Sequence, residues 1–322
     1  MTDIILALVG IALVLFGADK LTDGSVGLAR RFSIPEMVIG LTVVAFGTSL
    51  PEFVVSLMSA LQGSADMSIG NIIGSNLFNT LMIVGITAAI APIAVRKSTI
   101  YKDIPFTILA SVVLIALAAD HALDSATPQD LLTRSDGIAL LGFFAVFMAY
   151  TFAIANPSPQ TTEALLENSS APGMPVWKVA LFIVGGLVGL VLGGELFVRG
   201  ASSIARSLGV SDAVVGLTLV AGGTSLPELA TSVVAARKGN GGIAIGNVIG
   251  SNLFNIFWIL GFCSTITPMH VTGIRTVDFV MLLVSALLFW FFAKTQRTIL
   301  RWEGVVLVAV YVGYLAWLIS NV

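Results

Sequence analysis

The sequence has few charged residues, few histidines and almost no cysteine. Only 11% of its 322 residues are charged, whereas a soluble domain carries about 25%. The single cysteine, Cys263, excludes an internal disulfide and a metal site built on cysteines. The 16 lysines and arginines are too scattered to form a basic surface that binds nucleic acid. Because 57% of the residues are hydrophobic, the composition predicts an all-α integral membrane protein.

Two motifs occur twice, and both pairs are separated by the same 176 residues. Residues 40–52 match residues 216–228, with Gly-Thr-Ser-Leu-Pro-Glu at the end of each copy. Residues 70–79 match residues 246–255, and both contain Gly-Ser-Asn-Leu-Phe-Asn. The chain is therefore predicted to consist of two copies of one unit.

Long apolar runs accompany these repeats. A helix needs roughly 17–25 mainly apolar residues to cross the hydrocarbon core of a bilayer, and ten such runs predict ten transmembrane helices. A segment with four prolines divides them five and five, and its composition is typical of a linker. We predict a first five-helix repeat over 1–155, a linker over 156–175 and a second five-helix repeat over 176–322. The predicted spans are 3–20, 36–61, 68–91, 104–120, 136–155, 176–197, 212–236, 243–266, 277–293 and 303–320.

The basic residues predict how these spans are oriented. With ten spans, 12 of the 16 lysines and arginines fall in connections on one side, and positive residues mark the cytoplasmic side. The linker is then cytoplasmic and both termini lie outside. Since matching segments are five spans apart, the second copy crosses the membrane in the opposite direction. Such inverted-topology repeats bind their substrate near the midplane, where broken helices of the two halves meet.

Each copy places one glutamate, Glu52 or Glu228, within an apolar run. A buried ionisable group is costly in a membrane and indicates function. Ala45, Thr48, Ser49 and Glu52 are spaced so that they share one helical face, and the second copy repeats this spacing. The proline before each glutamate lacks an N–H group and is expected to break the helix there, freeing carbonyl groups for a ligand. Asp19 and Glu195 also match across the repeat, but they lie near predicted span ends and are expected to be interfacial.

The polar groups of these motifs are nearly all oxygen atoms. Carboxylates, hydroxyls, amide oxygens and carbonyls are the ligands of hard cations, and Ca²⁺ takes 6–8 of them. Zinc or copper would call for histidine or cysteine, which the motifs lack. Two nearby buried carboxylates repel each other when no cation is bound. This repulsion favours exchange of one cation for another over one-way transport.

The two paired motifs resemble the α-repeats of the calcium/cation antiporter family, in particular short prokaryotic members of its sodium/calcium exchanger branch. The resemblance covers essentially the whole chain. It implies that Glu52 and Glu228 bind Ca²⁺ in alternation with Na⁺, and that Asn79 and Asn255 complete the centre. Asn255 stands where some members, including potassium-dependent ones, have Asp, which argues against a K⁺ requirement. The resemblance further assigns the flanking Na⁺ sites to the side chains of Thr48, Ser49, Thr224, Ser225, Ser75 and Ser251 and to the carbonyls of Ala45 and Ala221.

The leading hypothesis is a Na⁺/Ca²⁺ antiporter of the cell (inner) membrane that expels Ca²⁺, with no cofactor and no obligate protein partner. The alternative is a proton-coupled Ca²⁺ or cation exchanger, although a proton carrier would not need the hydroxyls beside each glutamate. An intramembrane protease would need a histidine or metal near the glutamate, and both histidines fall in predicted connections. A scaffold or sensor without transport is disfavoured because both copies keep every type of ligand.

Overall fold

The structure is a computed structural model that describes residues 2–120, 130–155, 174–208, 221–271 and 274–320. Its first-half helices are α1 (Thr2–Arg31), α2 (Glu36–Ile39), η1 (Gly40–Val44), α3 (Ala45–Thr48), α4 (Leu50–Leu61), α5 (Ala65–Leu77), η2 (Phe78–Ile83), α6 (Val84–Ile90), η3 (Thr99–Asp103), α7 (Ile104–Ala118) and α9 (Arg134–Ala155). Its second-half helices are α11 (Val176–Ser207), α13 (Ala221–Thr224), α14 (Leu226–Arg237), α15 (Gly241–Leu253), η5 (Phe254–Leu260), α16 (Gly261–Ile266), α17 (Thr276–Gln296) and α18 (Arg301–Ser320). The elements labelled η are π-helical turns within longer helices.

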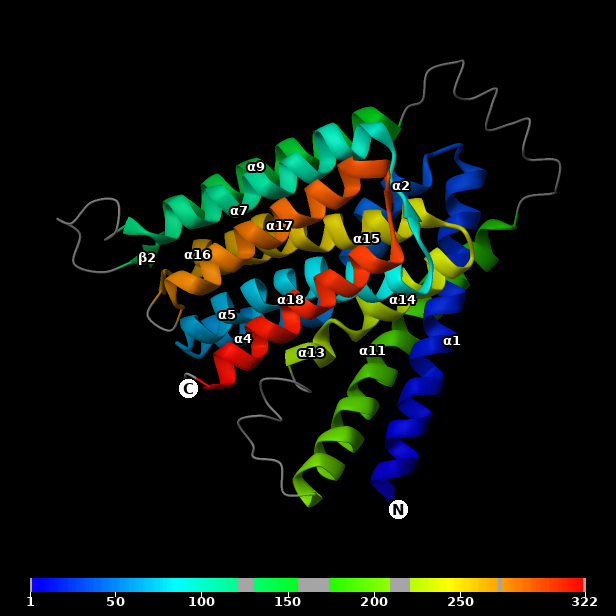
Figure 1. Cartoon of the computed structure of the whole chain (residues 1–322), viewed down its shortest axis with the longest axis horizontal. Coiled ribbons are helices and arrows are strands. Elements are labelled where there is room, and N and C mark those ends of the chain that lie inside the picture. Colours follow the sequence, from blue (N-terminus) through cyan, green and yellow to red (C-terminus); the bar gives the residue numbers. More distant parts are fainter. Residues whose placement is uncertain (1, 121–129, 156–173, 209–220, 272–273, 321–322) are drawn as a thin grey trace.

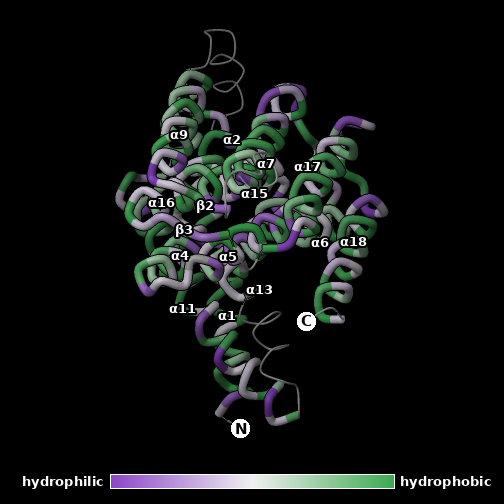
Figure 2. Tube along the Cα trace, turned by 90° about the vertical axis from the view of Figure 1, so that its left-hand side faces the viewer, coloured by the Kyte–Doolittle hydropathy of each residue, from purple (hydrophilic) through white to green (hydrophobic). Residues whose placement is uncertain are grey.

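The described residues confirm the predicted class of all-α membrane protein. Among them, eight helices are long and apolar enough to cross a membrane, and a bent pair of helices makes a ninth. Hydrophobic residues predominate along these helices (Figure 2). The described part of the remaining predicted span, 212–236, begins at residue 221 and forms α13 and α14. The predicted linker, 156–175, lies largely outside the described residues.

The bent pair is the first motif-bearing span. Glu36–Thr48 and Leu50–Leu61 meet at an angle of 48°. Ser49 leaves helical geometry at φ −84° and ψ 6°, and Pro51 lies in the first turn of α4. A proline has no N–H to continue the hydrogen-bond ladder. One helix therefore ends before Pro51, and the next helix begins with Pro51 in its first turn. The predicted helix break is confirmed, and Ser225 with Pro227 repeats it between α13 and α14.

The second motif of each half forms the centre of the bundle. In the most apolar 18-residue stretch of Gly241–Ile266, 94% of the residues are buried within the protein, and in that of Asp66–Ile90 72% are, whereas in α9 and α18 only 17% are. The two central spans are therefore shielded from lipid by the other helices. Small residues allow this close packing. A Cβ added to Gly246 would lie 2.7 Å from the main-chain oxygen of Met37, and one added to Gly40 would lie 2.8 Å from that of Ile243.

Helices α1 and α11 form a separate pair that crosses the other helices steeply (Figure 1). Glycines line their contact, so that the two backbones touch. A Cβ on Gly17 would lie 2.7 Å from the carbonyl oxygen of Gly186, and one on Gly193 would lie 2.8 Å from that of Gly10. Both helices are longer than the predicted spans 3–20 and 176–197. Lys20 and Arg199 end the apolar runs, but each helix continues for several residues beyond them.

Two short antiparallel ribbons join connections that are distant in the sequence. Strand β1 (Ile93–Ala94) pairs with β4 (Thr298–Ile299), with Ile93 opposite Ile299. Strand β2 (Leu131–Leu132) pairs with β3 (Met269–His270), with Leu131 opposite His270. Each ribbon requires its two connections to emerge on the same side of the bundle.

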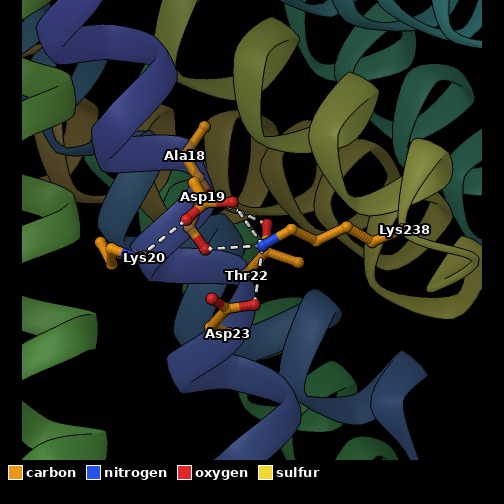
Figure 3. Close-up of polar contacts among 6 residues, drawn as sticks. All are labelled: Ala18, Asp19, Lys20, Thr22, Asp23 and Lys238. Carbon is orange, nitrogen blue, oxygen red and sulfur yellow. Dashed lines mark hydrogen bonds and ion pairs between the residues drawn. The ribbon is translucent and has the colours of Figure 1, made fainter.

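An ion-pair cluster ties the motif-bearing helix α14 to α1 (Figure 3). The ammonium group of Lys238, just after α14, lies 2.6 Å from a carboxylate oxygen of Asp19 and 2.7 Å from one of Asp23. It also donates a hydrogen bond to the main-chain oxygen of Asp19, and Lys20 pairs with Asp19 at 3.0 Å. Burial lowers the pKa of Lys238, but the hydrogen bonds to the two aspartates outweigh it, so the pKa is raised. The cluster therefore keeps its ion pairs at neutral pH.

Replacing Lys238 with methionine is expected to lower the free energy of unfolding by about 1 kcal/mol, because partly exposed ion pairs contribute little individually. Lys238→Arg keeps the charge and should remain close to the parent. Thermal unfolding in detergent, with and without 1 M KCl, measures the effect. The difference between the two variants should shrink in high salt, which screens exposed charges. Equal stability of the methionine and arginine variants at low salt would contradict the prediction.

Candidate cation site

The two glutamates lie in the first turns of α4 and α14, directly after the helix breaks. Both are almost completely buried, with 1% of Glu52 and 1% of Glu228 exposed. The breaks also place Ser49 and Ser225 between two helices. Both serines are buried as well.

Hydrogen bonds between the two halves bring these residues together. The hydroxyl of Ser49 donates to Oε1 of Glu228 at 3.1 Å, and the hydroxyl of Ser225 donates to Oε1 of Glu52 at 2.9 Å. Each carboxylate is thus held by a hydroxyl of the other half. The crossed pattern places both carboxylates in one site, with their helix breaks facing each other.

Eleven buried side-chain oxygen atoms have no hydrogen-bond partner among the described residues, and six of them belong to the predicted ligands. A buried polar atom without a partner costs free energy and calls for an explanation such as an ion. The six atoms form three pairs, each with one member from each copy of the repeat. They are Oε2 of Glu52 and Glu228, Oγ of Ser75 and Ser251, and Oδ1 of Asn79 and Asn255.

The serines and asparagines of this set come from the two central spans. Ser75 is in α5 and Asn79 is in the π-helical turn η2, while Ser251 and Asn255 have the same positions in α15 and η5. π-Helical turns are rare and often occur at functional sites. Here they begin at matching residues, Phe78 and Phe254, one residue before each asparagine. The sequence motif gave no sign of this local widening of the helix.

The other predicted ligands lie nearby but are already engaged. The Thr48 hydroxyl donates to the carbonyls of Val44 and Ala45, at 3.1 and 3.4 Å, and also lies 3.1 Å from Oδ1 of Asn247. The carbonyl of Ala45 accepts a hydrogen bond from the Ser49 N–H at 3.0 Å. The carbonyl of Ala45 thus accepts hydrogen bonds from both Ser49 and Thr48, and its role as a cation ligand stays a prediction.

The second copy is described less fully. Thr224 ends α13 and has a polar partner, and it lies close to the carboxyl group of Glu52. Ala221 is the first residue of α13. Residues 216–220 of this motif lie outside the described residues.

Four further asparagines, which the motifs did not predict as functional, support the site. Asn71 donates to the main-chain oxygen of Glu52 at 3.4 Å and to the hydroxyl of Ser56 at 3.0 Å. Asn247 makes the matching bonds to Glu228 and Ser232, at 3.3 and 3.0 Å. The remaining two are Asn76 and Asn252, which contact the asparagines of the site. All four occur at matching positions in both motifs, so the repetition itself was an available signal.

The site suits a cation that binds and leaves. Throughout the described part of the chain, no group of three or more His, Cys, Asp or Glu side chains is placed to hold a metal ion. Two carboxylates and several neutral oxygens match the preference of Na⁺ and Ca²⁺ for oxygen ligands, and the modest charge suits weaker binding. Among the described residues no salt bridge pairs either glutamate with a basic side chain, which leaves both carboxyl groups available to a cation.

Ser49→Ala and Ser225→Ala are expected to destabilise the protein equally, by about 1.5–3 kcal/mol each, because each removes a hydrogen bond to a buried charged group. Ser111→Ala is the control. Ser111 is also buried, but its hydroxyl bonds only to the main-chain oxygen of Thr107 in its own helix. Its removal should cost about 1 kcal/mol or less. Unfolding in detergent measures all three, and serine variants at the site that cost no more than the control would refute the prediction.

The chain is similar to several known proteins. A sequence profile of the family described as "Sodium/calcium exchanger protein" matches residues 2–153 and 178–320. The sodium/calcium exchanger MaX1 of Methanosarcina acetivorans is 31% identical to this chain, over 97% of the chain and 97% of MaX1. The inner membrane protein YrbG of Escherichia coli is 36% identical over 97% of the chain and 94% of YrbG.

The fold is also similar to that of a solved exchanger. The sodium-calcium exchanger NCX_Mj, soaked with 10 mM Na⁺ and 10 mM Sr²⁺, superposes with a TM-score of 0.82. It is 34% identical in sequence, and the match covers 98% of each chain. The chain therefore belongs to the sodium/calcium exchanger protein family.

Proposed function

We propose that this protein is a Na⁺/Ca²⁺ antiporter that exchanges the two ions by alternating access at the site between Glu52 and Glu228. The observation that carries the proposal is the set of six buried oxygen atoms without partners, matched in pairs between the two halves. The proposal is supported by the chain's membership of the exchanger family. It is also supported by MaX1 and NCX_Mj, both of which are named as exchangers of sodium and calcium.

Within this site, Glu52 and Glu228 would bind Ca²⁺, with Asn79 and Asn255 completing the centre. Hydroxyls and carbonyls on either side would bind Na⁺ in the other half of the cycle. Na⁺ carries a single charge and needs only neutral oxygens with one shared carboxylate. These flanking ligands are the side chains of Thr48, Ser49, Thr224, Ser225, Ser75 and Ser251 and the carbonyls of Ala45 and Ala221.

We further propose that ten spans form two inverted five-helix repeats, over 1–155 and 176–322, joined by a cytoplasmic linker. The ribbons support this arrangement. In a ten-span chain, the connections that contain β1 and β4 lie on one side, and those that contain β2 and β3 lie on the other. The crossed serine–glutamate bonds are also what a two-fold axis between the halves would produce. The basic residues favour an orientation with both termini outside, and the similarity to the inner membrane protein YrbG favours the inner membrane.

Alternating access follows from this symmetry. If the halves exchange conformations, the passage opens on the opposite face while the site remains between them. Two carboxylates that repel when empty disfavour the return of an unloaded site, which couples the two ions. The inward Na⁺ gradient would then drive Ca²⁺ out of the cell.

Transport by the purified protein in liposomes tests the proposal. Vesicles loaded with Na⁺ should take up ⁴⁵Ca²⁺ when diluted into Na⁺-free buffer, and vesicles loaded with K⁺ or choline should not. A pH gradient without Na⁺ should have no effect. Uptake driven by the pH gradient and indifferent to Na⁺ would refute Na⁺ coupling and establish the proton-coupled alternative.

A further inference from the structure

Two buried asparagines outside the proposed ligand set control the orientation of two inside it. The amide of Asn255 donates to Oδ1 of Asn76 at 2.9 Å, and the amide of Asn79 donates to Oδ1 of Asn252 at 3.1 Å. Both bonds cross from one half of the protein to the other. All four side chains are at most 2% exposed, so water does not compete for these groups.

An asparagine amide has one end that donates and one end that accepts, so fixing one end fixes the other. The nitrogen of Asn255 faces Asn76, which leaves its Oδ1 as one of the six oxygens without a partner. The same holds for Asn79 and Asn252. If either amide turned over, its NH₂ group would replace the oxygen and would repel a cation.

The orientation of Asn76 is set in turn by a group that can only accept. Its own nitrogen donates to the main-chain oxygen of Asn252 at 3.3 Å. A carbonyl oxygen has no proton, so the near atom of Asn76 is the nitrogen, and its Oδ1 must face Asn255. This carbonyl therefore fixes the orientation of the Asn76 amide, and through it the orientation of the Asn255 amide.

In the other half, the corresponding series of hydrogen bonds ends at a hydroxyl instead of a carbonyl. The nitrogen of Asn252 donates to the hydroxyl of Thr80 at 2.8 Å, and the residue that matches Thr80 in the second copy is Ile256. A hydroxyl can accept or donate, so Thr80 holds Asn252 less strictly than a carbonyl would. The two halves therefore share the bond to the site asparagine and differ in what anchors it.

We propose that Asn76 and Asn252 are positioning residues that turn the amide oxygens of Asn255 and Asn79 toward the transported cation. This inference rests on the proposed function, because it assigns those oxygens to the cation site. Asn76 and Asn252 do not contact the cation themselves. They determine whether two of its ligands present an oxygen or an NH₂ group.

Equilibrium binding of Ca²⁺ to the purified full chain in detergent tests this. Asn76→Ala removes the acceptor that holds Asn255, and the Kd for Ca²⁺ should rise at least about tenfold. In its protonated form, the buried carboxyl group of Asn76→Asp can donate to the carbonyl of Asn252 and accept from Asn255, so its Kd should stay within about threefold of the parent. Asn252→Ala repeats the measurement for the other half, so that if one alanine variant does not fold, the other still decides.

A purely structural role gives a different result. Both substitutions of Asn76 would then lower the melting temperature of the protein without Ca²⁺, and neither would change the Kd. An alanine variant that folds and binds Ca²⁺ within twofold of the parent would overturn the inference, as would an aspartate variant that binds as weakly as alanine.

The same experiment separates this inference from the antiport proposal. A parent protein that binds no Ca²⁺ would overturn both. A parent that binds Ca²⁺, but whose uptake into liposomes ignores the Na⁺ gradient, would overturn Na⁺ coupling and leave the role of Asn76 and Asn252 intact.

Discussion

Glu52→Gln and Glu228→Gln are each expected to reduce Na⁺-driven Ca²⁺ uptake by at least about 100-fold. A glutamine keeps the Oε1 that accepts the serine hydroxyl, so the crossed hydrogen bond can persist. It replaces the unpartnered Oε2 with an NH₂ group and removes one of the two negative charges. Removing one partner of a buried ionic interaction costs about 3–5 kcal/mol, which exceeds a factor of 100 in binding.

The same substitutions should not weaken the fold. Without cations, two buried carboxylates repel each other and lack water, so a neutral side chain of the same shape relieves both penalties. The melting temperature of either glutamine variant in cation-free buffer is therefore expected to equal or exceed that of the parent. Ca²⁺ should raise the melting temperature of the parent, because a ligand stabilises the state that binds it. That rise should be lost in both variants.

Glu195→Gln is the control for this pair. Glu195 is also a glutamate at a position matched across the repeat, but its side chain is 63% exposed and pairs with Arg199 in its own helix. The Ca²⁺ uptake and the Ca²⁺-dependent melting temperature of Glu195→Gln should match those of the parent. If Ca²⁺ stabilised Glu52→Gln as much as the parent, Glu52 would have no part in binding.

Much of the fold could be predicted because the membrane imposes simple rules on the sequence. Apolar runs of sufficient length indicate spans, and the two prolines before Glu52 and Glu228 indicate broken helices. The ends of α1 and α11 could not be predicted in this way. Beyond Lys20 and the segment near Glu195, these helices continue through polar residues, and hydropathy reports the apolar run rather than the helix. The β1–β4 and β2–β3 ribbons involve only two residues per strand, too few to leave a pattern.

The site was predictable in its ligand types and less so in its supporting contacts. Repetition of oxygen-bearing residues beside each glutamate pointed to a cation site before any geometry was known. The sequence did not reveal which hydroxyl pairs with which carboxylate, because the Ser49–Glu228 and Ser225–Glu52 bonds join residues 179 and 173 positions apart. The supporting asparagines were missed for a related reason. Asn76 appears as a buried polar residue in the motif, and only its contact with Asn255 gives it a role.

The structure also indicates why the central spans carry so many small residues. The neutral oxygens beside the two carboxylates can contribute to a cation site only if they are held at fixed distances, since each contributes little alone. Dense packing of α15 against α2, η1 and α3 fixes them. Gly246 and Gly250 permit this packing, because a Cβ on either would meet the main chain of the first motif span.

Gly250→Ala is accordingly expected to impair both folding and exchange. A Cβ at Gly250 would lie 2.6 Å from the carbonyl oxygen of Leu41 and 2.6 Å from the Cβ of Ala45. Neither atom can move without shifting the backbone of the helix that carries Thr48. Overpacking of this kind costs about 1–3 kcal/mol, and we expect a loss of that size in the free energy of unfolding. Since Ala45 and Thr48 belong to the proposed Na⁺ sites, the Na⁺ concentration for half-maximal exchange should also rise several-fold.

Gly313→Ala separates this effect from the intrinsic consequence of replacing a helical glycine. Gly313 lies in α18, is exposed, and would place its Cβ in open space within the described structure. Alanine favours a helix over glycine by about 1 kcal/mol, so this control should be as stable as the parent or more stable. Denaturant unfolding and Na⁺ titration of Ca²⁺ uptake measure both variants. A Gly250→Ala protein as stable as Gly313→Ala, with unchanged dependence on Na⁺, would mean that the contact between α15 and the first motif does not determine the geometry of the site.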